Sequence, residues 1–144
     1  MLAVLGSCTS TTEPLTFETQ LASVLTVSPT RVRVGDLVNA HWVIRNASHT
    51  DSLFRIFDPG ESASGFGLVL GATPASTVLQ YEHGGTLISY DSRLVLPPLG
   101  SYSLDAVFKA VDAGTATVDA CMPPVVGEGT EWTCVRKTVI VTAN

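Results

Sequence analysis

Residues 30–46, TRVRVGDLVNAHWVIRN, carry the clearest structural signal in the chain. Val32 and Val34 alternate with arginines, Gly35 and Asp36 interrupt the pattern, and a second, longer alternation then follows. A period of two places successive side chains on opposite faces of a β-strand. The stretch therefore predicts two strands joined by a turn or bulge. The apolar residues of the second strand are expected to point into a core; they are Val38, Ala40, Trp42 and Ile44.

Similar alternations recur along the chain, separated by turns rich in Gly, Pro and Asp. A strand about every 8 to 12 residues is typical of a β-sandwich. No stretch shows a helical period over three turns. The sequence therefore predicts an all-β fold, an antiparallel β-sandwich of about seven to nine strands. Further strands are expected at residues 23–28, 52–57, 65–70, 76–81, 86–96, 101–110, 114–121 and 134–142.

The order of these features resembles the opening strands of bacterial immunoglobulin-like domains. A short strand, the break at Gly35 and Asp36, a long strand and a closing Asn-Ala-Ser turn at residues 46–48 follow one another as in that family. The resemblance extends over residues 23–142 and implies an immunoglobulin-like arrangement of the sandwich. It brings no catalytic signature with it.

The composition fits one domain that neither binds nucleic acid nor crosses a membrane with its own chain. A length of 144 residues falls in the usual range of a single domain. The 13 acidic and 8 basic residues give a net charge of -5, which provides no basic stripe for a phosphate backbone. No run approaches the roughly 18 apolar residues that span a bilayer.

Two of the three cysteines enclose a loop. Cys121 and Cys134 stand at the ends of CMPPVVGEGTEWTC, a segment with Pro and Gly that lies between two alternating stretches. This arrangement predicts a β-hairpin closed by a disulfide, with two free thiols as the alternative. Closing such a loop stabilises a fold by about 3 kcal/mol, and disulfides persist in oxidising compartments. The chain is therefore expected to be exported.

A direct pairing of the two cysteines fixes the register of the whole hairpin. Asp119 then lies opposite Arg136, which is a favourable cross-strand pair. Lys137 lies opposite the apolar Val118 on the inward face, so either a bulge or a snorkelling lysine is needed there. The other pairs expected from this register are Thr117 with Thr138, Ala120 with Val135 and Ala116 with Val139.

The third cysteine, Cys8, has no partner in this scheme. Residues 5–8, Leu-Gly-Ser-Cys, resemble the lipobox of bacterial lipoproteins, in which an apolar residue and two small residues precede the lipidated cysteine. The resemblance implies a lipid anchor at Cys8 after signal cleavage, with the charged and apolar parts of the signal upstream of Met1. An ordinary cleaved signal and an incidental cysteine are the alternatives.

These features divide the chain into three parts. Residues 1–8 are predicted to be the remnant of a lipoprotein signal peptide, residues 9–20 a polar tether and residues 21–144 the immunoglobulin-like domain. The protein is expected to be a monomer in a bacterial cell envelope, lipid-anchored through Cys8, or secreted or periplasmic.

The sequence contains no recognisable catalytic or metal-binding constellation. His41, His49 and His83 are scattered without the spacing of metal ligands, so we expect no metal and no other cofactor. The stretch GESASGFG at residues 60–67 lacks the second glycine of a nucleophile elbow and the spacing of a dinucleotide fingerprint. We therefore expect no enzymatic activity.

The segment enclosed by the cysteines is the candidate binding loop. Its apolar residues are expected to form a tip braced by the disulfide, because loops at one end of a sandwich often carry binding function. The alternative is a loop folded back on the edge of its own sheet. The residues of the predicted tip are Met122, Val125, Val126 and Trp132.

Together these features favour a non-enzymatic, envelope-anchored or secreted immunoglobulin-like module. Such a module binds a protein or glycan partner or acts as a structural spacer. The alternative is a proteinase inhibitor that presents the disulfide-closed loop 121–134, since a closed loop is preorganised for a protease cleft.

Overall fold

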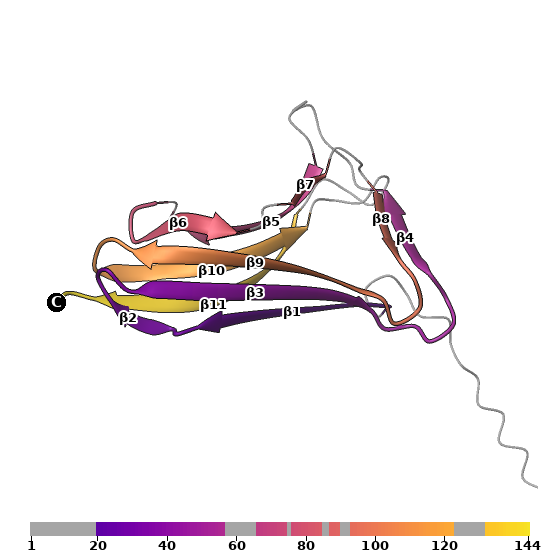
Figure 1. Cartoon of the computed structure of the whole chain (residues 1–144), viewed down its shortest axis with the longest axis horizontal. Coiled ribbons are helices and arrows are strands. Elements are labelled where there is room, and N and C mark those ends of the chain that lie inside the picture. The colour runs from indigo at the N-terminus through magenta and orange to yellow at the C-terminus, as the bar shows by residue number, and fades with distance from the viewer. Residues whose placement is uncertain (1–19, 57–65, 75, 85–86, 90–92, 123–131) are drawn as a thin grey trace, which may run out of the picture.

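The computed structural model describes residues 20–56, 66–74, 76–84, 87–89, 93–122 and 132–144 (Figure 1). All the secondary-structure elements of these residues are β-strands, so the protein is all-β, as the sequence predicts. The strands are β1 (Leu21–Ser28), β2 (Arg31–Arg33), β3 (Leu37–Asn46), β4 (Leu53–Ile56), β5 (Phe66–Thr73), β6 (Leu79–Gly84), β7 (Leu87–Ser89), β8 (Arg93–Leu96), β9 (Ser101–Ala110), β10 (Gly114–Met122) and β11 (Thr133–Thr142).

The strands form two larger sheets and a short ribbon. One sheet has the order β1-β3-β9-β6, the other has the order β2-β11-β10-β5-β7, and β4 pairs with β8 alone. Among the described strands, only β2 and β11 pair in parallel. The two larger sheets lie face to face, and the β4–β8 ribbon stands across the end that is opposite the C-terminus (Figure 1).

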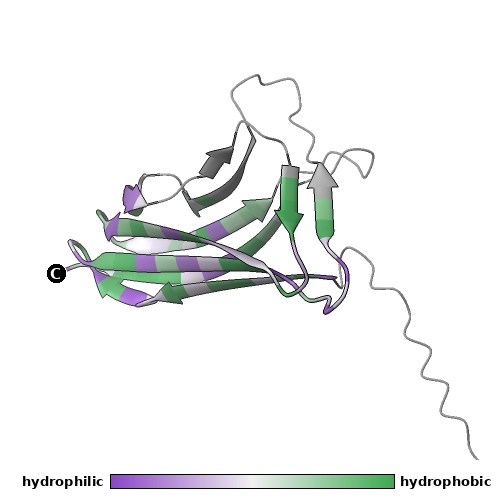
Figure 2. Cartoon of the chain, turned by 45° about the vertical axis from the view of Figure 1, so that its right-hand side comes forward, coloured by the Kyte–Doolittle hydropathy of each residue, from purple (hydrophilic) through white to green (hydrophobic). Residues whose placement is uncertain are grey.

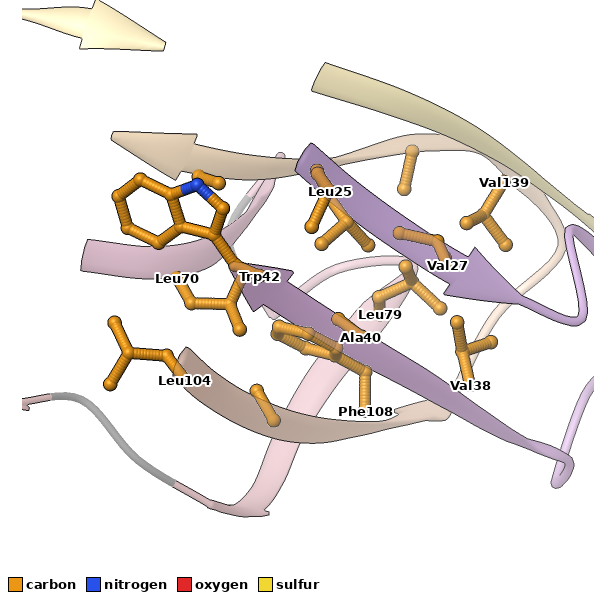
Figure 3. Close-up of a cluster of buried hydrophobic side chains, with 14 of the residues drawn as sticks. Leu25, Val27, Val38, Ala40, Trp42, Leu70, Leu79, Leu104, Phe108 and Val139 are labelled. Atoms are coloured by element: carbon orange, nitrogen blue, oxygen red, sulfur yellow. The ribbon is translucent and has the colours of Figure 1, made fainter. Parts of the chain in front are cut away.

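The core between the sheets contains the residues that the alternation in β3 predicts. Val38, Ala40, Trp42 and Ile44 are all at most 2% exposed. Figure 3 shows Trp42 among side chains of both sheets, which include Leu104 and Leu70. The indole Nε1 donates a hydrogen bond to Ser23 Oγ at 2.8 Å. The polar edge of the buried tryptophan is thus satisfied, as packing in a core requires.

The break at residues 33–36 is a tight turn between β2 and β3. The backbone N–H of Asp36 donates to Arg33 O at 3.0 Å, and Asp36 Oδ2 accepts from the Arg33 N–H at 2.9 Å. Gly35 has φ of +98°, a conformation that side chains with a Cβ rarely adopt. The glycine at this position is therefore required by the turn, not by packing.

The sequence prediction was wrong about residues 86–96, which form two strands instead of one. Residues 87–89 form β7, which pairs with β5, whereas residues 93–96 form β8, which pairs with β4. The described residues therefore contain eleven strands, more than the seven to nine expected. Asp91 and Ser92 fall between β7 and β8 and are turn-favouring residue types, so the sequence carried a signal for this break.

The end of β3 is held by the fully buried side chain of Asn46. The Asn46 side-chain amide donates hydrogen bonds to the backbone carbonyls of Leu96, the last residue of β8, of Pro97, which follows it, and of Asp51, which precedes β4. Gln20, which the sequence places in the tether, is also buried and donates to Asn46 Oδ1. These hydrogen bonds connect the β4–β8 ribbon to the end of β3, and so to the sheet that contains β1, β3, β9 and β6. The partners are Asp51 O (2.7 Å), Leu96 O (3.2 Å), Pro97 O (3.0 Å), Gln20 Nε2 (3.2 Å) and Ser48 N (3.0 Å).

Two glycines with positive φ give contrasting predictions. A Cβ on Gly35 would meet nothing within 4 Å, so Gly35→Ala carries only a backbone cost, about 1 to 2 kcal/mol. A Cβ on Gly84 would lie 2.4 Å from Asp105 O, so Gly84→Ala is expected to cost more, about 2 to 4 kcal/mol. Urea denaturation measures both free energies of unfolding. Equal losses would contradict the close approach of β6 to β9.

Candidate functional site

β10 and β11 form the hairpin that the cysteines predict. The Sγ atoms of Cys121 and Cys134 lie at disulfide distance, 2.10 Å apart, and the two residues are direct cross-strand partners. This register confirms each pair expected from the sequence. The pairs are Asp119 with Arg136, Thr117 with Thr138, Ala120 with Val135, Ala116 with Val139 and Val118 with Lys137.

Lys137 is accommodated without a bulge, because the β10–β11 pairing runs unbroken through it. Val118 is fully buried and Lys137 is exposed, although the two share the inward face. On its other side β11 pairs with β2 only over residues 140–142, so Lys137 lies on an edge of the described sheet. Snorkelling at this edge is the alternative that fits, and an inward-pointing lysine also discourages pairing with another chain.

On the outward face of the hairpin, Asp119 is the centre of a polar cluster. Its carboxylate accepts hydrogen bonds from Thr73 Oγ1 at 2.5 Å and Thr117 Oγ1 at 2.9 Å, and Arg136 Nε lies 3.2 Å from Oδ1. These donors satisfy a carboxylate that is largely removed from water. Because Arg136 is mostly exposed, the ion pair itself contributes little, and the cluster serves to join β5, β10 and β11.

Met122 and Trp132, the two described residues of the predicted binding tip, differ in burial. Met122 is only 7% exposed and belongs to the core, so its predicted place on an exposed tip is wrong. The alternation in β10 explains this, because Met122 shares the inward face with Val118 and Ala120. Trp132, by contrast, is 51% exposed. Further predicted positions lie outside the described residues; they are Cys8 with the signal remnant 1–8, tether residues 9–19, and Val125 and Val126.

A second apolar surface lies on the β4–β8 ribbon, and the sequence analysis missed it. Phe54 and Val95 are cross-strand partners on its outward face, 49% and 59% exposed. The inward face contributes buried leucines to the core. Figure 2 shows parts of both ribbon strands in green and the rest in grey, whereas several strands of the larger sheets alternate between green and purple. The unbroken apolar run Leu94-Val95-Leu96 is the sequence signal for apolar side chains on both faces of β8.

The ribbon and the loop-bearing ends of β10 and β11 lie at the same end of the molecule, opposite the C-terminus (Figure 1). Trp132 immediately precedes β11 at this end. We call this end of the molecule, which carries the exposed side chains of Phe54, Val95 and Trp132, the ribbon end. These residues come from separate parts of the chain: Phe54 and Val95 are paired in the ribbon, and Trp132 stands two residues before Cys134.

The described residues also show how the histidines are placed. His41 Nδ1 lies 2.5 Å from Asp105 Oδ1, across exposed positions of β3 and β9. Within the described ranges, no group of three or more His, Cys, Asp or Glu side chains is arranged to hold a metal ion. No helix in that part of the chain has the length and apolar character needed to cross a membrane.

No model of a known protein family matches this chain, and neither does any curated protein. The ribbon end is therefore interpreted from its own geometry.

The disulfide is expected to contribute to the free energy of unfolding. Replacing both Cys121 and Cys134 by serine is expected to lower the free energy of unfolding by about 3 kcal/mol, because the unfolded chain loses its cross-link. Urea denaturation of the oxidised protein measures this loss, and Cys8→Ser is the matched control, expected to have no effect. An equal loss in the Cys8→Ser variant, or none in the double variant, would contradict the pairing.

Proposed function

We propose that this protein is a non-enzymatic, envelope-anchored or secreted immunoglobulin-like module that binds a protein or glycan partner through the ribbon end. The supporting observation is that three large apolar side chains are about half exposed at one end of a rigid scaffold: Phe54, Val95 and Trp132. Contiguous exposed apolar groups, such as the paired Phe54 and Val95, commonly mark interaction sites, and tryptophan is enriched among residues that dominate binding energy.

The strand order supports the immunoglobulin-like part of the proposal. In that fold, strands A, B, E and D form one sheet and C, F and G form the other. The order β1-β3-β9-β6 fits the first set, and β5, β10 and β11 fit the second. The chain differs in that its disulfide joins neighbouring strands of one sheet and that β2, β7 and the β4–β8 ribbon are additions to these seven strands.

The proposed location rests on the cysteines. A disulfide between Cys121 and Cys134 is favoured in an oxidising compartment, which supports export. Export in turn is what a lipid anchor at Cys8 requires. Gln20 lies beside the ribbon end through its bond to Asn46, so an anchored chain would enter the domain at that end.

The test compares two variants that each remove one exposed apolar side chain. Wild type is screened against a glycan array and against proteins of the bacterial surface. Trp132→Ala is expected to weaken the binding found by about tenfold or more, because truncating a central aromatic residue costs at least about 1.4 kcal/mol. Leu37→Ala is the control, since Leu37 is 50% exposed at the opposite end and should leave binding unchanged.

Other outcomes of these experiments would favour a structural spacer or a proteinase inhibitor. Absence of any binding would indicate a structural spacer, and equal loss in both variants would contradict a site at the ribbon end. Pairing of Met122 with Thr133 fixes the two stems of the loop between them, which supports a proteinase inhibitor as second candidate. Inhibition of a protease by wild type that is lost in Val125→Asp and Val126→Asp would favour this second candidate.

A further inference from the structure

A shallow pocket lies on the outward face of the five-stranded sheet, where β2 runs beside the end of β11. Its volume is about 260 Å³, which approaches the lower end of small-molecule sites. The pocket is at the C-terminal end of the sheets, away from the ribbon end (Figure 1). The residues that line it are Arg31, Val32, Arg33, Asp36, Ile140 and Thr142.

Two arginines face outward at this pocket. Arg31 pairs with Ile140 and Arg33 with Thr142, while Val32 between them is buried on the inward face. Residues two apart on a strand share a face with Cα atoms about 7 Å apart. In the part of the chain that the structure describes, neither guanidinium has an ion-pair or hydrogen-bond partner. Two adjacent unpaired cations repel each other, and a bound anion would relieve that repulsion.

The backbone around the pocket is held in place before any ligand binds. The Val34 N–H donates to Thr142 O at 3.1 Å, and the Gly35 N–H donates to Ala110 O at 2.7 Å. Thr142 Oγ1 donates to Val32 O at 3.2 Å, which fixes the hydroxyl at the pocket wall. A site that needs no ordering on binding keeps more of its interaction energy as affinity.

The other lining groups narrow the class of ligand. Asp36 Oδ2 already accepts from the Arg33 N–H, and a carboxylate at this place disfavours a bare dianion such as phosphate. It also offers an acceptor for hydroxyl groups, and Ile140 offers an apolar surface. A planar carboxylate matches the fork of a guanidinium. We propose that this pocket binds one unit of an acidic saccharide, with its carboxylate on Arg31 and Arg33 and its hydroxyls toward Asp36.

The experiment is an NMR titration of the full protein with trigalacturonate in low-salt buffer. The expected result is saturable binding, with shift changes concentrated at residues 31–36 and 140–142. The Arg31→Gln/Arg33→Gln double variant is expected to bind about tenfold more weakly or worse. Arg45→Gln removes a similar exposed charge from β3 and should change the affinity less than about twofold.

Titrations with other ligands and variants test each part of the proposal. Maltotriose, which is neutral, is expected not to bind, and equal binding would overturn the role of the anion. Inorganic phosphate binding as tightly as trigalacturonate would overturn the saccharide assignment. Equal loss in Arg45→Gln, or no binding of trigalacturonate at millimolar concentration, would overturn the site. Trp132→Ala should leave this titration unchanged, so its result is independent of binding at the ribbon end.

Discussion

The Asn46 side chain forms hydrogen bonds with groups from three separate parts of the chain at the point where β3 ends: the Gln20 side chain, the backbone of residues 48–51 and the backbone of residues 96–97. A two-stranded ribbon has little stability by itself in water, so β4 and β8 depend on what holds them to the rest of the fold. Burial of Leu53, Leu94 and Leu96 supplies the apolar part of that attachment. The amide of Asn46 supplies the directional part, because its donors reach Leu96 O and Asp51 O, which flank the ribbon. The position of the exposed Phe54–Val95 pair follows from these leucines and the Asn46 amide together.

The hairpin is fixed by a different set of interactions. Direct pairing of the cysteines sets the register of β10 and β11, and that register brings Arg136 to Asp119 on the outward face. The same register places Lys137 at the edge of the core. Trp132 therefore lies next to a pair of strands that a disulfide cross-links. The β4–β8 ribbon, by contrast, is held in place by hydrogen bonds and packing. The two halves of the ribbon end are held independently of each other.

The features that sequence analysis predicted correctly are those set by a period of two along one strand. The inward face of β3 and the register from Cys121 to Cys134 follow from alternation and from one covalent link. Met122 was misplaced because the loop composition outweighed the strand alternation that continues through it. The ribbon and the Arg31–Arg33 pocket were missed for another reason. Both arise from pairing between segments far apart in the sequence: the local pattern indicates strands and an apolar run at residues 94–96, but not which strands pair.

The central structural claim is that Asn46 locks the ribbon to the sheets, and hydrogen–deuterium exchange of Asn46→Ala measures this directly. Loss of these bonds is expected to cost about 3 kcal/mol locally, so backbone amides of residues 53–55 and 94–96 should exchange about 100-fold faster than in wild type. Amides of β10 and β11 should keep their protection. Unchanged exchange in the ribbon, or equal acceleration in the ribbon and the hairpin, would contradict the account.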